Sequence, residues 1–295
     1  MKRTTVIMAL VSASLAVSCA RNADISMPSV IRPGDFLLAD GSVLSRDTDA
    51  ETVRNANVIG IVFSTDTSLM SDYDKQYLRD KGVRTPLGFA LSLRDAGDGT
   101  CKWYEDTYTG AYLKDEKEIG VGDVYAESDS YATYRLADRD FNGLENTVLI
   151  RQSRQEEFEE GDYPAFSAAY SYNDIVPVPE NATEWYFPSC GQLLEIVRNL
   201  AGATLEEENM IPANDNDFIW ENQGKVVSAI NSSMEKVSGD LKQPFREGDV
   251  YWTSSPAMPT EACFIYFDDG GSVFVLRSLK NSSNSVRPVL GFGSF

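Results

Sequence analysis

The stretch WYFPSCGQL at residues 185–193 carries the clearest local signal in the chain. Apolar residues recur at helical spacing from Leu193 to Leu200, and Pro188-Ser189 comes directly before them. Ser189 is therefore the expected N-cap, and Gln192 stands three residues later, where a capping box has Glu or Gln. We expect a helix that begins after Ser189 and packs one face inward.

Two further landmarks follow this helix. YWTSS at residues 251–255 is an aromatic strand with a Ser/Thr tail, and VRPVLGF at 286–292 is a closing strand with an Arg-Pro pair. Together with the helix opener, and in this order, they resemble a C-type-lectin-like domain of bacterial surface and secreted proteins, often lipoproteins of Bacteroidota. The opening strands, GDFLLADG at 34–41 and IGIVF at 59–63, are similar too. The resemblance implies a C-type-lectin-like α+β fold, related to that of formylglycine-generating enzymes, which displays binding loops and usually catalyses nothing.

The residues themselves also predict an α+β chain. A second amphipathic helix is expected at 226–241, weakened by Gly239, and the sequence Asp268-Asp269-Gly270-Gly271 predicts a hairpin. Two helices before a terminal antiparallel sheet favour α+β over a parallel, doubly wound sheet. Strands are expected at 34–42, 58–63 (buried on both faces) and 88–93, and then at 250–254, 263–267, 273–276 and 286–292.

The N-terminus resembles an export signal. Lys2 and Arg3 precede an apolar stretch that is too short to span a bilayer, so residues 1–18 are predicted to be a cleaved signal peptide. Cys19 follows a sequence that resembles a lipobox and is the predicted lipidation site. Residues 19–32 would be a tether and 33–295 a single domain. The expected location is the cell envelope, as an outer-membrane lipoprotein facing the surface or the periplasm.

Charge and composition exclude several functions. Removal of residues 1–18 deletes Lys2 and Arg3 and no acid, which changes the net charge from −19 to −21. Nucleic acid and anionic membrane surfaces are therefore excluded as electrostatic partners, and contact with a membrane is expected through the N-terminal lipid alone. The chain contains no His, so it has no Ser-His or Cys-His nucleophile pair and no imidazole zinc ligand.

The cysteines leave two alternatives open. Beyond Cys19 only Cys101, Cys190 and Cys263 remain, an odd number without a CxxC motif. Either Cys190 and Cys263 form a disulfide, because a helix start and a neighbouring strand carry them, or all three are buried thiols.

Residues 98–163 give the weakest structural signal. They contain two acidic clusters, at 115–118 and 156–160. The clusters indicate either a solvated acidic insertion or, as the less favoured alternative, a cation site. Asn214-Asp215-Asn216-Asp217 resembles a calcium loop but lacks EF-hand spacing, so Asn214, Asp215 and Asp217 are weak calcium candidates and a helix-capping loop is favoured. No cofactor is predicted.

Three large side chains are expected to be structural. Trp185 and Trp252 lie inside apolar runs and are predicted core anchors. Arg287, before Pro288, is predicted to donate to carbonyls or acids beneath the sheet rather than to a ligand.

The predicted binding surface consists of the loops after Trp252. It includes the hairpin and the polar, basic stretch 277–285, which reads as one flexible loop. The candidate ligand-binding residues are Asp268, Asp269, Arg277, Lys280, Asn281 and Asn284. The favoured function is a non-enzymatic, lipid-anchored adhesion module for a protein or glycan. The alternative is a structural or tip subunit of a surface fibre or envelope complex, and a third reading is a formylglycine-generating-type oxidase.

Overall fold

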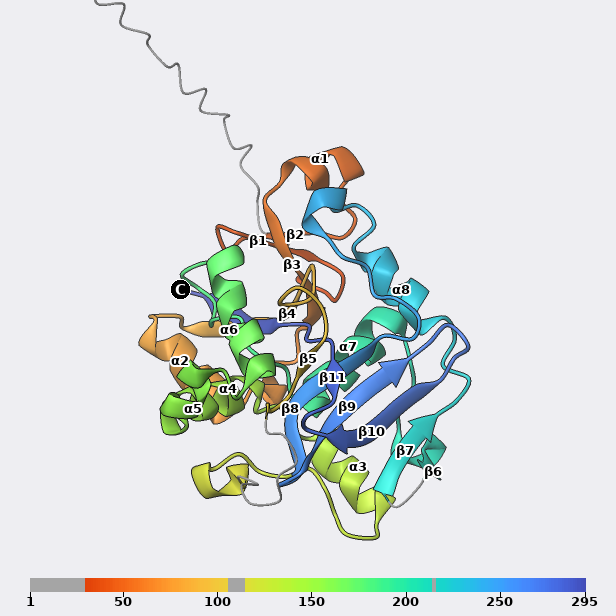
Figure 1. Cartoon of the computed structure of the whole chain (residues 1–295). Helices are drawn as coiled ribbons and strands as arrows, with labels where there is room; N and C mark the ends of the chain where they lie inside the picture. The colour runs from red at the N-terminus through yellow and green to blue at the C-terminus, as the bar shows by residue number, and fades with distance from the viewer. Residues whose placement is uncertain (1–29, 106–114, 214–215) are drawn as a thin grey trace, which may run out of the picture.

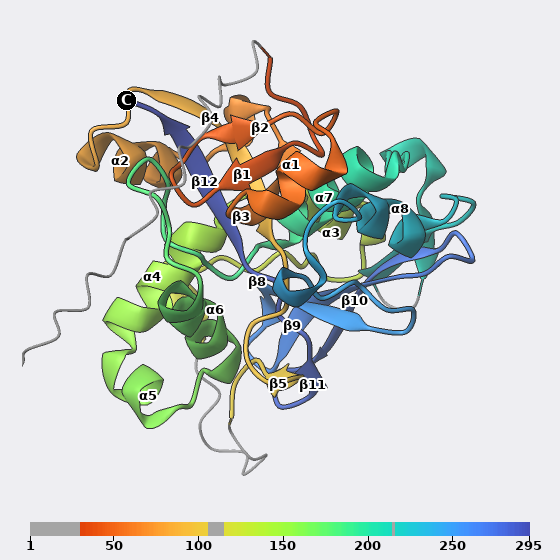
Figure 2. The same ribbon diagram turned by 90° about the horizontal axis from the view of Figure 1, so that it is seen from above.

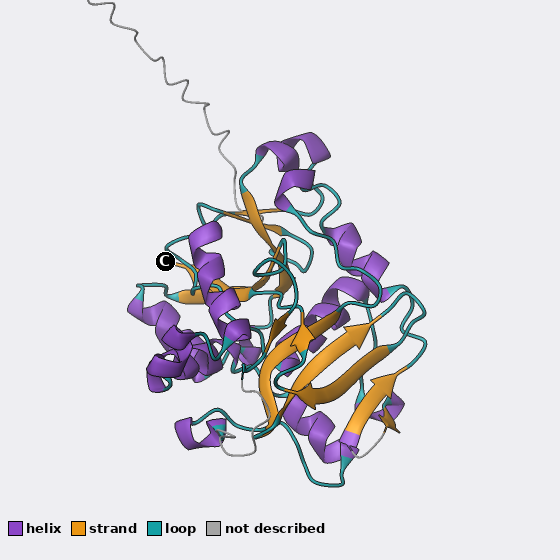
Figure 3. Ribbon diagram, viewed as in Figure 1, coloured by secondary structure: helices purple, strands orange, loops and turns teal. Residues whose placement is uncertain are grey.

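The computed structural model describes residues 30–105, 115–213 and 216–295. These residues form two five-stranded antiparallel sheets with helices packed between and beside them, which confirms the α+β class (Figures 1 and 3). The signal peptide, Cys19 and most of the tether lie outside the described residues. No helix of the described part is long and apolar enough to cross a membrane.

The first sheet has the strand order β12-β4-β3-β1-β2. Every residue of its central strand β3 is buried, as the continuous apolar run predicts. Its strands are β1 (Phe36–Leu38), β2 (Val43–Leu44), β3 (Val58–Ser64), β4 (Thr85–Ser92) and β12 (Val289–Ser294).

The place of the closing strand differs from the expectation. We expected it in one terminal sheet with the three strands before it, but β12 pairs with β4 of the first sheet. The reason is that β12 finds hydrogen-bond partners on both sides there. Its Val289 exchanges backbone hydrogen bonds of 2.9 and 3.1 Å with Tyr186 on the side away from β4.

The second sheet has the order β6-β7-β10-β9-β8. The predicted hairpin joins β9 and β10, where Phe267 pairs with Val273. Its strands are β6 (Ile211–Ala213), β7 (Asp217–Trp220), β8 (Val250–Met258), β9 (Glu261–Phe267) and β10 (Val273–Leu279). A short ribbon of β5 (Cys101–Lys102) and β11 (Ser283–Asn284) lies beside β8.

The helices pack between and beside the sheets (Figure 2). The described part of 98–163 contains the helices α3, α4 and α5, and it is not solvated throughout, because α4 buries Leu144, Val148 and Ile150. The helices are α1 (Ala50–Asn55), α2 (Asp72–Asp80), α3 (Ser130–Asp138), α4 (Gly143–Ser153), α5 (Gln155–Glu160), α6 (Pro164–Ile175), α7 (Cys190–Ala201) and α8 (Val226–Ser233), with 3-10 turns η1 (Thr67–Leu69), η2 (Glu116–Ile119), η3 (Glu207–Asn209) and η5 (Gly239–Leu241).

The second expected helix is shorter than predicted. α8 ends at Ser233, and the chain then turns so that Met234 and Val237 are buried in the core. Apolar residues at helical spacing therefore indicated burial correctly but not a continuous helix to residue 241.

The three sequence landmarks meet at the start of α7. Ser189 and Gln192 form the predicted capping box. The Ser255 hydroxyl of β8 accepts a 2.9 Å hydrogen bond from the Cys190 N–H, and the Pro188 carbonyl accepts one of 2.8 Å from the Ser254 N–H. Tyr186, just before the helix, bonds β12. The start of this helix thus ties both sheets together.

Gly191, in the first turn of α7, leaves no room for a side chain. A Cβ there would lie 2.6 Å from the Asp140 carbonyl oxygen and 2.8 Å from that of Asp138. We expect Gly191→Ala to lower the free energy of unfolding by about 1–3 kcal/mol, because backbone must move. Gly239→Ala is the control, since a Cβ there meets nothing within 4 Å. Urea denaturation measures both, and equal effects would contradict the packing described.

Candidate functional site

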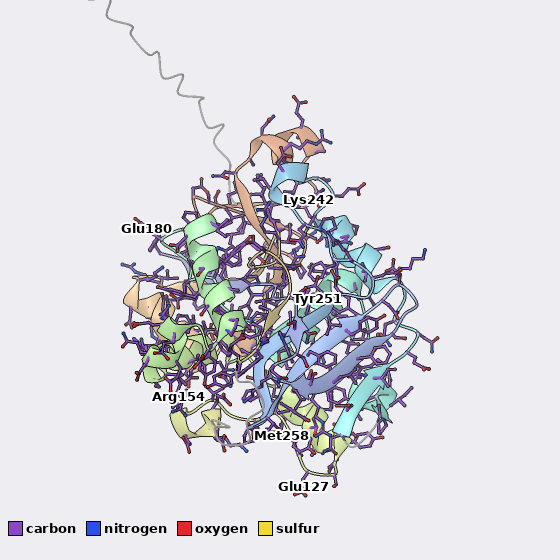
Figure 4. All side chains as sticks on the ribbon, viewed as in Figure 1. Glu127, Arg154, Glu180, Lys242, Tyr251 and Met258 are labelled. Atoms are coloured by element: carbon purple, nitrogen blue, oxygen red, sulfur yellow. The ribbon has the colours of Figure 1, made fainter. Side chains whose placement is uncertain are left out.

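The predicted ligand-binding residues lie at two opposite ends of the second sheet rather than on one surface. Asp268 and Asp269 belong to the β9–β10 hairpin, at the end where β8 begins. Lys280 and Asn281 follow β10 at the other end, where the Lys280 N–H donates a 3.0 Å hydrogen bond to the Thr260 carbonyl. In Figure 4, the labelled Tyr251 lies toward the hairpin end of the sheet, and the labelled Met258 lies at the Lys280 end. One ligand-binding loop surface is therefore not formed.

The hairpin acids make local hydrogen bonds. Asp268 accepts a 2.9 Å bond from the Ser272 N–H, and Asp269 accepts one of 2.9 Å from the Ser228 N–H in the first turn of α8. Burial acts to raise the pKa of Asp269, but the hydrogen bonds from Ser228 outweigh it, and the pKa lies below its ordinary value. Asp269 therefore helps to cap α8 as a carboxylate.

Lys280 is buried, which corrects its predicted place on a display loop. Only 4% of its side chain is exposed, and its ammonium forms an ion pair with Glu116, whose side chain is 2% exposed. The ammonium also lies 4.5 Å from the centre of the Trp103 ring. Burial lowers the pKa of Lys280 and raises that of Glu116, in each case against the attraction of the partner.

The stretch 277–285 is not one flexible loop, which corrects a second expectation. Its first three residues belong to β10, and Ser283–Asn284 form β11, where Asn284 pairs with Cys101. Asn281 is half-buried. Arg277 lies 3.4 Å from a carboxylate oxygen of Glu261 and stacks over the Tyr125 ring. The polar residues whose composition predicted a loop thus belong in part to β10 and to the β5–β11 ribbon.

The acidic clusters form no evident metal site. Within the described ranges no group of three or more His, Cys, Asp or Glu is placed to hold a metal ion. Asn214 and Asp215 lie outside those ranges, and Asp217 begins β7, 3.9 Å from Arg277. Glu116 of the first acidic cluster is buried, whereas α5, which contains the second cluster, has no buried residue.

Trp185, Trp252 and Arg287 are structural, as predicted. The two indole N–H groups donate to the carbonyls of Val176 (2.9 Å) and Cys101 (3.1 Å), and both rings are fully buried. Arg287 is fully buried as well. Its guanidinium lies 2.6 Å from Asp95 and stacks 4.2 Å from the Phe245 ring centre.

Cys101, Cys190 and Cys263 are free thiols, so the Cys190–Cys263 disulfide is not formed in this structure. Burial raises the pKa of Cys101 to about 11 and that of Cys190 and Cys263 further still. Since the thiolate is the reactive form, none of the three environments activates a nucleophile.

A cleft of about 500 Å³ opens between α3, α4 and the segment that follows η2. Three of its five charged groups are already bonded: Arg135 with Glu207, Asp123 with Lys117, and the buried Asp140 with the Ser255 hydroxyl. The other two, Arg139 and Glu145, carry opposite charges. The cleft contains none of the predicted ligand-binding residues, and its charges of both signs single out no ligand class.

The outer face of the second sheet carries a cluster of apolar side chains, a feature that the sequence reasoning missed. We call it the outer patch, and its residues are Ile211, Ile219, Phe264, Tyr266, Phe274 and Leu276. The pairings Ile211–Ile219, Ile219–Phe274, Phe274–Tyr266 and Leu276–Phe264 make these residues neighbours on adjacent strands. They alternate with fully buried residues such as Val273, Val275 and Ile265, which face the core.

The outer patch is partly exposed. Ile211 is 44% exposed, and the other five side chains are half-buried. Figures 1 and 2 show α3 and α7 on the opposite side of the sheet. Among the described elements, the β5–β11 ribbon reaches the β8 edge of the outer face, where the Trp252 indole donates to Cys101. The signal was available in the runs FIYF (264–267) and VFVL (273–276), which are apolar at outward positions too.

The fold and this site define an α+β protein with two antiparallel sheets, one of which has a partly exposed apolar face. No protein-family model matches the chain, and no curated protein matches its sequence. The chain is similar in fold to a solved fimbrial protein from Bacteroides ovatus, with a TM-score of 0.58 and 18% sequence identity over 89% of this chain. The match covers 49% of the fimbrial protein, so the chain spans about half of its length.

Proposed function

We propose that this chain is a non-enzymatic subunit of a surface fibre or envelope complex. The observation that carries the proposal is the likeness of its fold to the fimbrial protein over 89% of the chain. The buried, protonated thiols and the absence of His support a role without catalysis. The subunit is held in the cell envelope by a lipid on Cys19, and its partner is a protein.

The fold of this subunit is C-type-lectin-like. Support comes from the junction at the start of α7, where the helix opener, the Ser/Thr tail of β8 and the closing strand β12 bond one another. Adhesion through the loops after Trp252 ranks second, because Lys280 is buried and the remaining candidates are divided between two ends of the sheet.

The proposal is tested in cells that make the full chain with a C-terminal tag, which the exposed Phe295 can carry (61% exposed). After mild detergent extraction we expect the tagged chain to co-purify with a protein partner in a fixed ratio. We also expect antibodies against the tag to label fibres or envelope complexes in electron micrographs. Recovery of a monomer alone would contradict the proposal. Cys19→Ala is the control for anchoring, and we expect it to abolish processing and lipid attachment.

A further inference from the structure

We infer that the outer patch binds a single apolar polypeptide segment, without net negative charge, from a neighbouring protein of the same assembly. This inference rests on the proposed function and names the surface through which the subunit is held.

The first argument is that the outer patch lies outside the core. Ile211, Ile219, Tyr266, Phe274 and Leu276 pack against neither of the two buried clusters of the protein, and Phe264 touches one of them only from its edge. Tyr266 and Phe274 instead pack on each other, with ring centres 5.3 Å apart. Residues 30–105, 115–213 and 216–295 therefore cover the apolar surface of these side chains only in part.

The second argument is the residue pattern of the strands. An antiparallel sheet with one face in water normally alternates apolar and polar residues. Here Phe264, Tyr266, Phe274 and Leu276 are apolar at outward positions that alternate with core residues. Strands that are apolar on both faces are typical of sheets covered on both sides, and the largest contiguous apolar patch of a protein is often functional.

Size argues against a second copy of this chain as the occupant. The six side chains lie on four strands about 4.8 Å apart, along a length of about four residues of 3.3 Å, so the patch spans roughly 250 Å². A stable dimer interface buries about 800 Å² on each partner. A face-to-face dimer would also bring together two chains of net charge −19. One extended or helical segment, in contrast, matches the size of the patch.

Charge defines the chemistry of the segment. The hairpin end of the patch carries Asp268 and Asp269, and Glu247 accepts a 3.2 Å hydrogen bond from the Asp269 N–H. Lys225 attracts the Asp269 carboxylate, but none of the three acids forms an ion pair within residues 30–105, 115–213 and 216–295. A basic segment is attracted to this end of the patch and a neutral segment can bind there, whereas an acidic segment is repelled. The aliphatic Ile211, Ile219 and Leu276 favour apolar side chains over a sugar, because a glycan needs convergent hydrogen-bonding groups to orient its hydroxyls.

The test uses the full chain and three fluorescent peptides of equal length, in which Val alternates with Lys, Ser with Lys, and Val with Glu. We expect fluorescence anisotropy to detect binding of the Val-Lys peptide, and much weaker binding of the other two. The double variant Phe274→Ser/Leu276→Ser should bind the Val-Lys peptide about tenfold more weakly, as expected when central apolar contacts are removed.

The matched control is Tyr131→Ser/Leu136→Ser, which removes an aromatic residue and a leucine that are 42% and 45% exposed on α3. It should keep wild-type affinity, and both double variants should melt cooperatively. Equal loss in both variants, or equal binding of the Ser-Lys peptide, would overturn the inference. So would sedimentation that shows a wild-type dimer lost in the patch variant, or patch-dependent binding of chitohexaose.

This inference and the proposed function can fail separately. If the Phe274→Ser/Leu276→Ser chain still co-purifies with its partner in the wild-type ratio, the subunit role stands and the outer patch is not its contact. If the wild-type chain is recovered alone but binds the Val-Lys peptide through the patch, the segment-binding chemistry stands and the fibre or complex role fails.

Discussion

Replacing Lys280 with Met is expected to lower the free energy of unfolding by about 3–5 kcal/mol, because the substitution leaves the buried Glu116 carboxylate without its cation. The two side chains are 4% and 2% exposed, so water cannot replace the lost partner. The Trp103 ring also loses the ammonium that lies 4.5 Å from its centre. Urea denaturation followed by circular dichroism gives the difference directly.

Removing both charges should restore most of this loss. In the double variant Lys280→Met/Glu116→Leu no buried charge remains unpaired, and replacement of a buried ion pair by apolar residues is often neutral. Lys117→Met is the matched control one residue along from Glu116. Its ion pair with Asp123 joins a lysine side chain that is 55% exposed to an aspartate side chain that is 7% exposed. Water can replace the exposed lysine in part, so we expect a smaller loss than for Lys280→Met. Wild-type stability of Lys280→Met would instead mean that the Lys280 ammonium is not held in a buried ion pair and is accessible to a ligand, as the sequence predicted.

Replacing Arg287 with Met should lower the free energy of unfolding by a similar amount, about 3–5 kcal/mol. Arg287 is fully buried, and besides Asp95 its guanidinium bonds the Gln243 carbonyl at 2.9 Å. Arg277→Met is the control, because the Arg277 side chain is 20% exposed and lies 3.4 Å from Glu261. A smaller loss of stability for Arg287→Met than for Arg277→Met would show that the Arg287–Asp95 pair stabilises the fold less than the Arg277–Glu261 pair.

The deficit of Arg287→Met should depend on pH in a defined direction. Burial raises the pKa of Asp95, and Arg287 opposes that rise. Without Arg287 the pKa of Asp95 in the folded state rises further above its unfolded value. The stability contributed by protonated Asp95 is then present at low pH and lost as the pH rises through the folded-state pKa. The variant should therefore be closest to wild type in acid. A deficit that grows as the pH falls would be inconsistent with this account.

Local signals allowed the sequence to predict individual elements. The capping box of Ser189 and Gln192 involves residues three apart, and the β9–β10 hairpin is encoded within four residues. Both are confirmed, as is the buried strand β3. Contacts between segments that are far apart in the sequence could not be predicted. Lys280 and Glu116 are 164 residues apart, and nothing near Lys280 in the chain indicates that its charge is paired in the interior.

The same distinction between local signals and distant contacts applies to the candidate site. A polar stretch such as 277–285 has the composition of an exposed loop, and only the pairing of Asn284 with Cys101 shows it to be partly a ribbon. The outer patch was not predicted, for the opposite reason. Runs such as FIYF and VFVL predict strands correctly, but they do not tell whether the second apolar face is covered within the same chain.

The place of β12 has a consequence for when the protein can fold. Its residues pair with Leu91 and Ala90, some two hundred positions earlier, and bond Tyr186 on the other side. A ribosome releases the N-terminal part first, so the early strands must wait for residues 289–294 before their sheet is complete. Pairing over such a sequence separation is also slow. The first sheet therefore stays open at its β4 edge until residues 289–294 have been synthesised, which makes its completion a late step of folding.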